Sequence, residues 1–424
     1  MRILWLCSTP VRAVTESLGL PTAVLGGWMN GAYNDLMAER DIKLCICYPQ
    51  SRVNFPEQSV GEGFTSFGFP WKGEEDSNAN PTRILFKRIL EDFYPDCIHI
   101  FGTEHEYCLL MAQIAEACGL GSRISISIQG LVSICGLQFL PDFPRKELKR
   151  ASLSELKNRC SLWDQRESYL RRGESEKRLI EKAHYVMGRT EWDEGCCRLI
   201  NPYMHYRYVG ETLRDEFYHA EPRCEIASHR IFFSQGGKPI KAMHRLVEAL
   251  PIVKSIYPDV KVVVSGISSL RTDRLRGLTY DRYLARRMNE LGVADCFEFL
   301  GMLGPSELIA QMQSCALFVS TSSIENSPNS MGEAMMLGLP CVASYVGGVP
   351  SIAKPGEEAL LFPLNETEML AHYIIWVFSH EREAEDLGLR GRTRALINHS
   401  RERNREQLIS VYREISAGAD GAIL

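Results

Sequence analysis

Residues Ser320–Pro363 read STSSIENSPNSMGEAMMLGLPCVASYVGGVPSIAKPGEEALLFP, and no other stretch says more about the fold. An apolar run, Ala316–Ser320, comes directly before it, so Thr321–Pro328 is predicted to be a loop at the carboxyl end of a buried strand. A short helix is expected to begin near Ser330 and to end at Gly338, with another strand directly after it. Strand, loop, helix and strand in this order are typical of a parallel α/β sheet.

The same alternation of short apolar runs and amphipathic helices continues along the whole chain. Helical patterns are clear at Ala242–Tyr257 and Tyr280–Leu291. The candidate strands are Ile3–Cys7, Ile42–Tyr48, Ile98–Phe101, Ile124–Ile128, Tyr185–Gly188, Arg230–Ser234, Val262–Ser265, Phe297–Leu300, Ala316–Ser320 and Pro340–Ser344. These strands would overfill one sheet, so we expect two doubly wound, Rossmann-like α/β halves that meet near residues 205–225. Ligands of such sheets bind beyond the carboxyl ends of the strands, which predicts an interdomain cleft.

Composition limits the classes of function. The chain has 424 residues, of which 45% are hydrophobic and 24% charged, as expected for a globular protein of two or three domains. Its formal net charge of −5 gives no general attraction to nucleic acid, so we expect no nucleic-acid partner. No apolar run is long enough to cross a bilayer, and the first residues, MRILWLC, resemble a strand rather than a signal peptide. The 14 cysteines form no C-x-x-C pair, so a reduced, cytoplasmic protein is expected.

The loop and the helix after Ala316–Ser320 contain the candidate binding groups. Free backbone amides of Asn329, Ser330 and Met331 at the start of the helix would form an anion site suited to a diphosphate. Glu325 in the loop and Glu333 in the first helical turn are both placed to accept hydrogen bonds from hydroxyl groups of one ligand. Simpler interpretations remain open. Glu333 is also in position to complete a capping box with Ser330, Glu325 could be a solvated loop charge, and Asn-Ser-Pro-Asn could be an ordinary turn.

This pattern resembles a known family. Glu325 and Glu333 with Pro-Asn between them, followed by Glu-Ala-Met, Gly-x-Pro and Val-Gly-Gly-Val-Pro, are similar to the donor site of family 4 retaining glycosyltransferases of the GT-B fold. The resemblance implies that Glu325 contacts the transferred sugar and Glu333 the ribose of a nucleotide-diphosphate sugar, for which UDP is the expected nucleotide. The amides of Asn329, Ser330 and Met331 would then bind the phosphates.

The resemblance extends upstream to Phe232–Lys241, which is similar to the family's strand, Gly-Arg loop and lysine. Lys241 matches the phosphate-binding lysine, whose ammonium would offset charge on the leaving diphosphate. Gly236 and Gly237 match the loop, but the arginine of the family pattern is absent, and Lys238 is expected to supply the second positive charge. The alternative for Lys241 is an exposed lysine at a helix N-terminus.

The first half of the chain resembles the family more loosely. Gly26 and Gly27 match a Gly-Gly loop that lets the backbone approach the donor or the acceptor. Gln129 occupies the position of a histidine in many members, so it can form a hydrogen bond to the sugar but cannot take a proton. His105, in the loop after Ile98–Phe101, is expected to face the cleft, whereas His99 within that strand is expected to be a satisfied core residue.

From the resemblance we expect residues 1–209, with the C-terminal helix 401–424 packing back on them, to bind the acceptor, and residues 210–400 to bind the donor. The implied reaction is retaining transfer of a hexose to an acceptor hydroxyl, by front-face displacement, in surface polysaccharide or glycolipid assembly. The acceptor would be a carbohydrate or a lipid-linked molecule. No Asp-x-Asp occurs in the sequence, and no residues have metal-ligand spacing, so neither a metal nor a separate cofactor is expected.

Other functions remain to be weighed. A nicotinamide-dependent oxidoreductase is disfavoured because no Gly-x-Gly-x-x-Gly follows any candidate strand. A sugar-nucleotide 2-epimerase and a catalytically inactive GT-B-fold binding subunit stay open as alternatives. The segment 145–182 is rich in Lys and Arg, which is typical of a solvated helical face or of a peripheral contact with an anionic membrane on its inner face.

Overall fold

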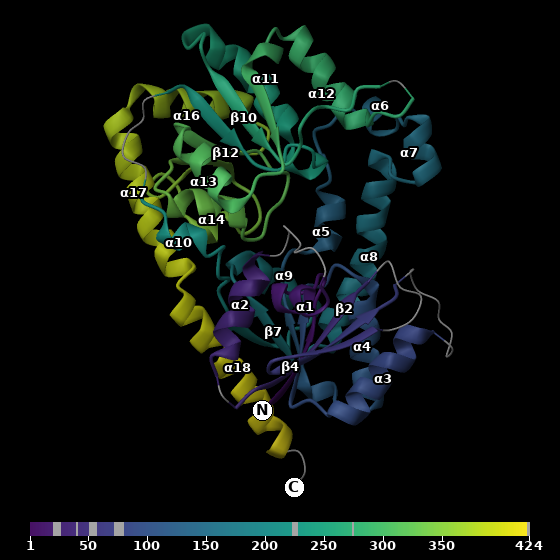
Figure 1. Ribbon diagram of the computed structural model, residues 1–424. Helices are drawn as coiled ribbons and strands as arrows, with labels where there is room; N and C mark the ends of the chain where they lie inside the picture. Colours follow the sequence, from purple (N-terminus) through teal and green to yellow (C-terminus); the bar gives the residue numbers. More distant parts are fainter. Residues whose placement is uncertain are drawn as a thin grey trace. The chain divides into compact units, whose positions relative to one another are not determined.

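The computed structural model describes residues 1–19, 27–39, 41–50, 57–71, 80–222, 228–273 and 275–421. The chain divides into two compact units. Unit 1 contains residues 1–133, 171–213 and 399–424, and unit 2 contains residues 134–170 and 214–398. Each unit is an α/β domain built around one sheet (Figure 1). No helix among the described residues is long and apolar enough to span a membrane.

Unit 1 is built on a sheet with the order β3-β4-β2-β1-β5-β6-β7-β8 among the described residues. All neighbouring pairs are parallel except β3 and β4, which are antiparallel. The strands are β1 (Arg2–Leu6), β2 (Lys43–Pro49), β3 (Glu57–Gly61), β4 (Phe64–Phe69), β5 (Cys97–Phe101), β6 (Ile124–Ser127), β7 (Tyr185–Gly188) and β8 (His205–Tyr208).

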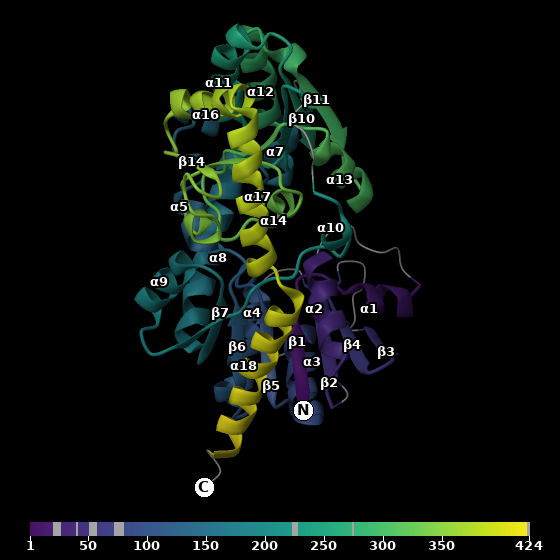
Figure 2. The same ribbon diagram turned by 90° about the vertical axis from the view of Figure 1, so that its left-hand side faces the viewer.

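Helices cover both faces of this sheet. Ile3 and Trp5 of β1 belong to a core that includes residues of α2 and α18, while Leu4 and Leu6 are equally buried and point to the opposite face. Figures 1 and 2 show α2 and α18 side by side, and Trp5 Nε1 donates a hydrogen bond of 2.9 Å to the hydroxyl of Tyr412 in α18. The described helices that lie wholly in this unit are α1 (Arg12–Ser17), α2 (Gly27–Met37), α3 (Pro81–Phe93), α4 (Glu106–Ala117), α9 (Glu191–Ile200) and α18 (Arg401–Gly421), with a short 3-10 turn, η1 (Gly121–Arg123).

Unit 2 is built on a fully parallel sheet with the order β11-β10-β9-β12-β13-β14. The strands are β9 (Arg230–Phe233), β10 (Lys261–Ser265), β11 (Phe297–Gly301), β12 (Leu317–Ser320), β13 (Cys341–Ser344) and β14 (Leu360–Phe362). They are connected by α11 (Met243–Ile256), α12 (Thr279–Glu290), α13 (Pro305–Gln313), α14 (Asn329–Met336) and α15 (Val349–Ile352), with 3-10 turns at η2 (Pro239–Lys241) and η3 (Ala294–Cys296). After the last strand, β14, comes α16 (Thr367–Ser379). The unit also includes α10 (Glu216–His219) and α17 (Glu381–Asn398), and α17 packs along α14 (Figure 2).

One segment of unit 2 comes from within the sequence of unit 1. Residues 134–170 contain α6 (Arg145–Leu148), α7 (Leu153–Asn158), most of α5 (Val132–Leu137) and the first half of α8 (Leu162–Lys182). Phe139, Leu140 and Phe143 of this segment join the buried core of unit 2 around α11 and α12. The expected division at residue 209 or 210 placed this segment in the first domain, and the structure groups it with the second.

All ten strands expected from the sequence are present within a residue or two of their predicted bounds. Their arrangement as two parallel α/β sheets confirms the predicted fold class. In unit 2, β9 lies at the point where the strand order reverses, because it pairs with β10 on one side and with β12 on the other. The loops that follow β9 and β12 therefore leave the same edge of the sheet side by side, which is where an open α/β sheet binds its ligand.

Candidate functional site

The loops after β9 and β12 are joined by hydrogen bonds. The amide of Ser323 donates to the carbonyl of Ile240 at 2.9 Å, and the hydroxyl of Thr321 lies 3.0 Å from the carbonyl of Lys241 and 2.9 Å from that of Ala242. Thr321 and Ser323 are both buried, so these bonds are shielded from water. The two loops therefore form one structure, which fixes the position of Lys241 relative to Glu325.

Lys241 and Glu325 form an ion pair at this edge. The ammonium of Lys241 contacts Oε1 of Glu325, and the side chains are only 17% and 14% exposed. The hydroxyl of Ser322 donates a second hydrogen bond, of 2.6 Å, to the same carboxylate oxygen. The sequence predicted both charged groups as parts of one site, and the structure brings them together. It also adds Ser322, whose hydroxyl the sequence analysis missed within the Thr-Ser-Ser run.

The Val-Gly-Gly-Val loop holds the backbone of Glu325 from the other side. The amide of Gly348 donates to the carbonyl of Glu325 at 3.0 Å. Gly347 has φ = +51°, and a Cβ atom there would lie 2.0 Å from the same carbonyl oxygen. No other residue type fits this close approach without moving the backbone that carries Glu325.

Gly236, Gly237 and Lys238 follow β9 in the same loop. A Cβ atom at Gly236 would lie 2.4 Å from Val264, and one at Gly237 would lie 2.3 Å from Ile267, so both positions require glycine for packing. Burial and the neighbouring charge of Lys241 lower the pKa of Lys238 below its ordinary value. The ammonium of Lys238 has no hydrogen-bond or ion-pair partner among the described residues. The loop thus places Lys238 near Lys241, and its action on a diphosphate stays a prediction.

The start of α14 differs from the prediction in one respect. The helix begins at Asn329, one residue earlier than expected, and the amide of Met331 donates to the carbonyl of Pro328 at 3.0 Å. Met331 therefore has no free amide, whereas no backbone partner is found in the described part of the chain for the amides of Asn329 and Ser330. The side-chain oxygen of Asn329 is also buried without a hydrogen-bond partner there. Of the three amides predicted to bind a diphosphate, two therefore stay available and that of Met331 does not.

Glu333 is held by an arginine that the sequence analysis missed. Arg214 donates two hydrogen bonds to its carboxylate, from Nε at 2.7 Å and from Nη2 at 2.6 Å. Burial raises the pKa of Glu333, and the two hydrogen bonds from Arg214 oppose this rise. The capping-box alternative is wrong, because Pro328 caps the helix and both oxygens of Glu333 are engaged by Arg214. Arg214 lies in the aperiodic stretch between the two halves, where no pattern marked it.

A second buried ion pair connects the loop after β12 to the segment 134–170. Arg245 in α11 is 5% exposed and binds both carboxylate oxygens of Asp142, at 2.8 and 2.5 Å. Its Nη1 donates to the carbonyl of Thr321 at 2.8 Å. Burial would raise the pKa of Asp142, but the nearby imidazole of His244, 3.6 Å away, and the hydrogen bonds from Arg245 outweigh it and lower that pKa. Arg245 therefore ties the loop that carries Glu325 to a distant part of the chain.

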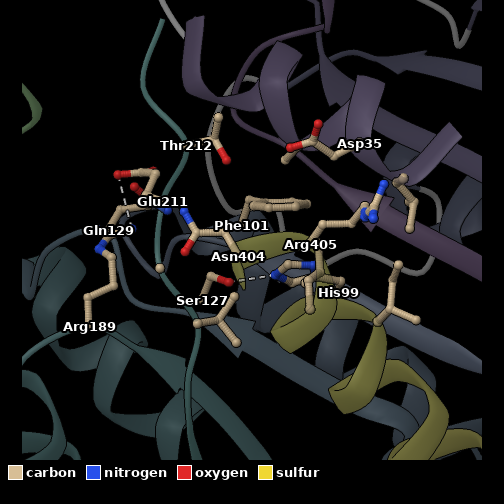
Figure 3. Close-up of a pocket in the computed structure, with 16 residues that line it drawn as sticks. Asp35, His99, Phe101, Ser127, Gln129, Arg189, Glu211, Thr212, Asn404 and Arg405 are labelled. Atoms are coloured by element: carbon tan, nitrogen blue, oxygen red, sulfur yellow. Dashed lines mark hydrogen bonds and ion pairs between the residues drawn. The ribbon is translucent and has the colours of Figure 1, made fainter. Parts of the chain in front are cut away.

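The remaining predicted residues belong to unit 1. Gln129 follows β6 and lines a pocket with Ser127 (Figure 3). His105 is the N-cap residue of α4 and stacks on Tyr107 with ring centroids 5.0 Å apart. Burial together with Arg172 lowers its pKa. Gly27 is the first residue of α2, whereas Gly26 lies outside the described residues.

His99 is a satisfied core residue, as predicted. Its Nδ1 lies 2.6 Å from the hydroxyl of Tyr412 and its Nε2 lies 2.6 Å from that of Ser127, the second contact being drawn in Figure 3. Burial lowers its pKa to about 3, so the ring is neutral at physiological pH.

Parts of this sequence are similar to known proteins. Residues 227–394 match the family model of glycosyl transferases group 1. Spore coat protein SA of Bacillus subtilis is 25% identical over 213 residues, which are 49% of this chain and 55% of that protein. A D-inositol 3-phosphate glycosyltransferase of Corynebacterium urealyticum is 25% identical over 178 residues, which are 42% of this chain and 41% of that protein. The chain thus aligns with about half the length of these relatives.

Solved structures match over nearly the whole chain. Sucrose-phosphate synthase from Thermosynechococcus elongatus superposes with a TM-score of 0.67 at 17% identity, covering 98% of this chain and 99% of that one. Anabaena HepE in complex with UDP-glucose superposes with a TM-score of 0.63 at 15% identity, covering 98% and 100%. The chain has the fold of GT-B glycosyltransferases, and its second half carries the sequence pattern of glycosyl transferases group 1.

Proposed function

We propose that the protein is a retaining glycosyltransferase that moves a hexose from a nucleotide-diphosphate sugar, UDP-linked, to an acceptor hydroxyl. The observation that carries the proposal is the ion pair of Lys241 and Glu325 beside the start of α14, at the strand-order reversal of unit 2. This edge of the sheet carries groups for each part of such a donor. The positive charge and the free amides suit the diphosphate and its leaving oxygen, and the carboxylate suits the sugar hydroxyls.

The ion pair suggests how the donor is received. In the free protein Lys241 and Glu325 neutralise each other. A bound diphosphate offers the ammonium of Lys241 a stronger anion, and the hexose offers Glu325 hydroxyl donors, so each group exchanges one partner for another. The amides of Asn329 and Ser330 add hydrogen bonds to the phosphates, and Lys238 adds a second positive charge.

Transfer then follows a front-face displacement. The bond between the anomeric carbon and the β-phosphate oxygen breaks, and the acceptor oxygen forms its bond to that carbon on the same face. The acceptor proton passes to the departing phosphate oxygen, so atoms and charge balance without an enzyme nucleophile. Lys241 and the two amides stabilise the diphosphate as it leaves, and this step needs no metal ion and no cofactor.

We further propose that unit 1 binds the acceptor, a carbohydrate or lipid-linked molecule of surface polysaccharide or glycolipid assembly, with Gln129 and His105 as hydrogen-bonding groups.

The protein would act in the cytoplasm, peripherally on the inner face of the membrane. Support comes from the exposed cations Arg145, Lys146 and Lys149 of the segment 134–170. Replacing these three with Gln should lower binding to vesicles with anionic lipid and leave binding to neutral vesicles unchanged. Equal binding of the wild type and of this triple variant to anionic vesicles would contradict the proposed membrane contact.

A nucleotide-sugar panel tests the transferase proposal and separates it from its rivals. UDP, GDP and their glucose, galactose and N-acetylglucosamine derivatives are compared by thermal shift, because a ligand of the native state raises the melting temperature. UDP release is then measured with and without oligosaccharide and lipid-linked acceptors. Acceptor-dependent release with an α-linked product, read by NMR of the anomeric proton, supports retaining transfer. Release without any acceptor favours a 2-epimerase, and binding without release favours a binding subunit.

Glu325 supplies the matching variant test. Charged hydrogen bonds contribute about 1.5–3 kcal/mol, so Glu325→Ala should slow turnover by about 10- to 150-fold. Glu368→Ala, at an exposed position of α16, removes the same charge from the same unit and should leave turnover unchanged. Equal rates for E325A and wild type would remove the sugar-binding role from Glu325.

A further inference from the structure

The carboxylate of Glu325 uses only one of its two oxygens for contacts with the protein. Lys241 and Ser322 both bind Oε1, and the hydroxyl of Ser322 does so at 2.6 Å. Oε2 has no hydrogen-bond partner among the described residues, and it is not one of the fully buried atoms there that lack a partner. Because the side chain of Glu325 is 14% exposed, Oε2 is the oxygen that a ligand can reach.

The two groups on Oε1 differ in their freedom to move. Lys241 carries its ammonium on a flexible stem of four carbons, and its side chain is 17% exposed. It can therefore exchange Glu325 for a bound diphosphate. Ser322 is 1% exposed, and its hydroxyl is attached directly to Cβ, so it moves only with the backbone. After that exchange, Ser322 is the protein group that stays on the carboxylate.

Hydrogen bonds fix the backbone around Ser322. The hydroxyl of Ser344 donates to the carbonyl of Ser322 at 2.7 Å. Thr321 and Ser323, on either side of it, are bound to the loop after β9. All these bonds use backbone groups that no donor needs, so the position of the Ser322 hydroxyl does not depend on whether the site is occupied.

A neighbouring serine orients the hydroxyl of Ser322. Oγ of Ser320 lies 3.3 Å from Oγ of Ser322. An ionised carboxylate only accepts hydrogen bonds, so Ser322 must donate to Glu325, and its own oxygen is left to accept from Ser320. Hydrogen bonds linked in this way polarise and strengthen one another, which favours a firm hold on Oε1.

We propose that Ser322 is a positioning residue for the contact of Glu325 with the transferred sugar, an inference that rests on the proposed transferase function. When the diphosphate binds the ammonium of Lys241, the hydroxyl of Ser322 keeps Oε1 in place and Oε2 turned toward a hydroxyl of the hexose. Without Ser322 the released carboxylate would sample several rotamers, and the free energy of ordering it would be taken from sugar binding.

The test compares ligands with and without the sugar. UDP-glucose, UDP-galactose and UDP-N-acetylglucosamine are titrated into the full chain by calorimetry, with UDP alone as the probe that lacks a hexose. The proteins are the wild type, Ser322→Ala and Ser323→Ala. Ser323 is the matched control, because it is also 1% exposed and its hydroxyl lies 3.4 Å from Nη1 of Arg245 instead of on Glu325.

We expect S322A to bind the tightest of the three UDP-sugars about tenfold more weakly than the wild type, because a hydrogen bond to a charged group is lost. Its affinity for UDP should change by less than about twofold, since UDP offers Glu325 no sugar hydroxyl. S323A should match the wild type with every ligand.

The variant Glu325→Ala separates positioning from a general structural role. If Ser322 acts through Glu325, adding S322A to E325A should cause no further loss of UDP-sugar affinity. A merely structural role would weaken UDP and the UDP-sugars alike, and its effect would add to that of E325A.

The proposal would be overturned by unchanged UDP-sugar affinity in S322A, by equal weakening of UDP and UDP-sugars, by the same loss in S323A, or by a further loss in the double variant. If S322A does not fold, Ser322→Cys, whose thiol is a weaker donor, is judged by the same criteria. A wild type that binds neither UDP nor a UDP-sugar would refute the transferase proposal and this inference with it. A wild type that binds them, beside an unchanged S322A, would refute this inference alone.

Discussion

The pair of Asp142 and Arg245 gives a prediction whose size follows from the structure. Arg245 is 5% exposed, and the carboxylate of Asp142, with its side chain 26% exposed, accepts two of its hydrogen bonds. Asp142→Ala leaves a buried guanidinium without its counter-charge. Breaking a buried ion pair from one side costs about 3–5 kcal/mol, and since water can reach this pair from the side of Asp142, we expect about 2–3 kcal/mol.

That loss should appear as a lower melting temperature. For a unit of this size about 1 kcal/mol corresponds to about 2–4 °C, so the midpoint of unit 2 should fall by about 4–12 °C in calorimetry. Because Nη1 of Arg245 also holds the carbonyl of Thr321, hydrogen exchange should quicken in the loop that carries Glu325.

Glu147→Gln is the matched control for this prediction. Glu147 lies in the same segment and pairs with Arg150 and Arg286, whose side chains are 59% and 44% exposed. Glu147 itself is buried, but both arginines reach water, so E147Q leaves no charge buried without solvent. The loss should therefore stay below about 1 kcal/mol, and the midpoint should fall by no more than about 2–4 °C. An unchanged midpoint in D142A, or an equal fall in D142A and E147Q, would refute the reasoning.

Three further predictions concern charged and titrating groups. Lys241→Met should lower the rate of UDP release by about 100-fold or more, with a smaller change in UDP affinity. An equal loss of rate and of affinity would contradict the role of Lys241 at the leaving group. Arg214→Met leaves Glu333 buried without its partner and should lower the free energy of unfolding by about 3–5 kcal/mol in urea, and adding Glu333→Gln should recover part of the loss. Burial lowers the pKa of His99 from 6.5 to about 3, so between these pH values only the unfolded chain binds the proton. Stability in urea should therefore fall as the pH drops through this window, by up to about 1.4 kcal/mol per pH unit, and His99→Asn should reduce that slope.

The sequence predicted most of the central strands and missed several at the sheet edges, although the edge strand β11 was predicted and the central strand β4 was missed. Apolar runs such as IFF in β9 and VVV in β10 are central and buried. The missed strands were β3, β4, β8 and β14, and three of these, β3, β8 and β14, lie at sheet edges. An edge strand buries less of its surface, so sequences such as EQSVG and HYRY show no apolar run.

The candidate site divides in the same way. Lys241, Glu325 and the glycines of both loops follow from short, ordered patterns, because each loop must leave its strand at a fixed point. The structure starts α14 one residue earlier than predicted, and the amide of Met331 is therefore hydrogen-bonded within the first turn. Ordered spacing predicts which groups reach the sheet edge, whereas the local hydrogen bonds of a turn decide which amides stay free.

By itself the sequence determined the two parallel sheets, the loops that follow their strands and the charged groups on those loops, because alternating burial and turn chemistry are local properties of a chain. Only the tertiary structure decided that Arg214 holds Glu333 across 119 residues, that Asp142 holds Arg245 across 103, and that residues 134–170 pack with unit 2. The tertiary structure likewise decided the pocket around Arg189, Glu211 and Asn404, which distant segments of the chain form together. Contacts between distant segments leave no periodic trace in the sequence, since any residue of the right charge and size can satisfy them once the backbone brings the segments together.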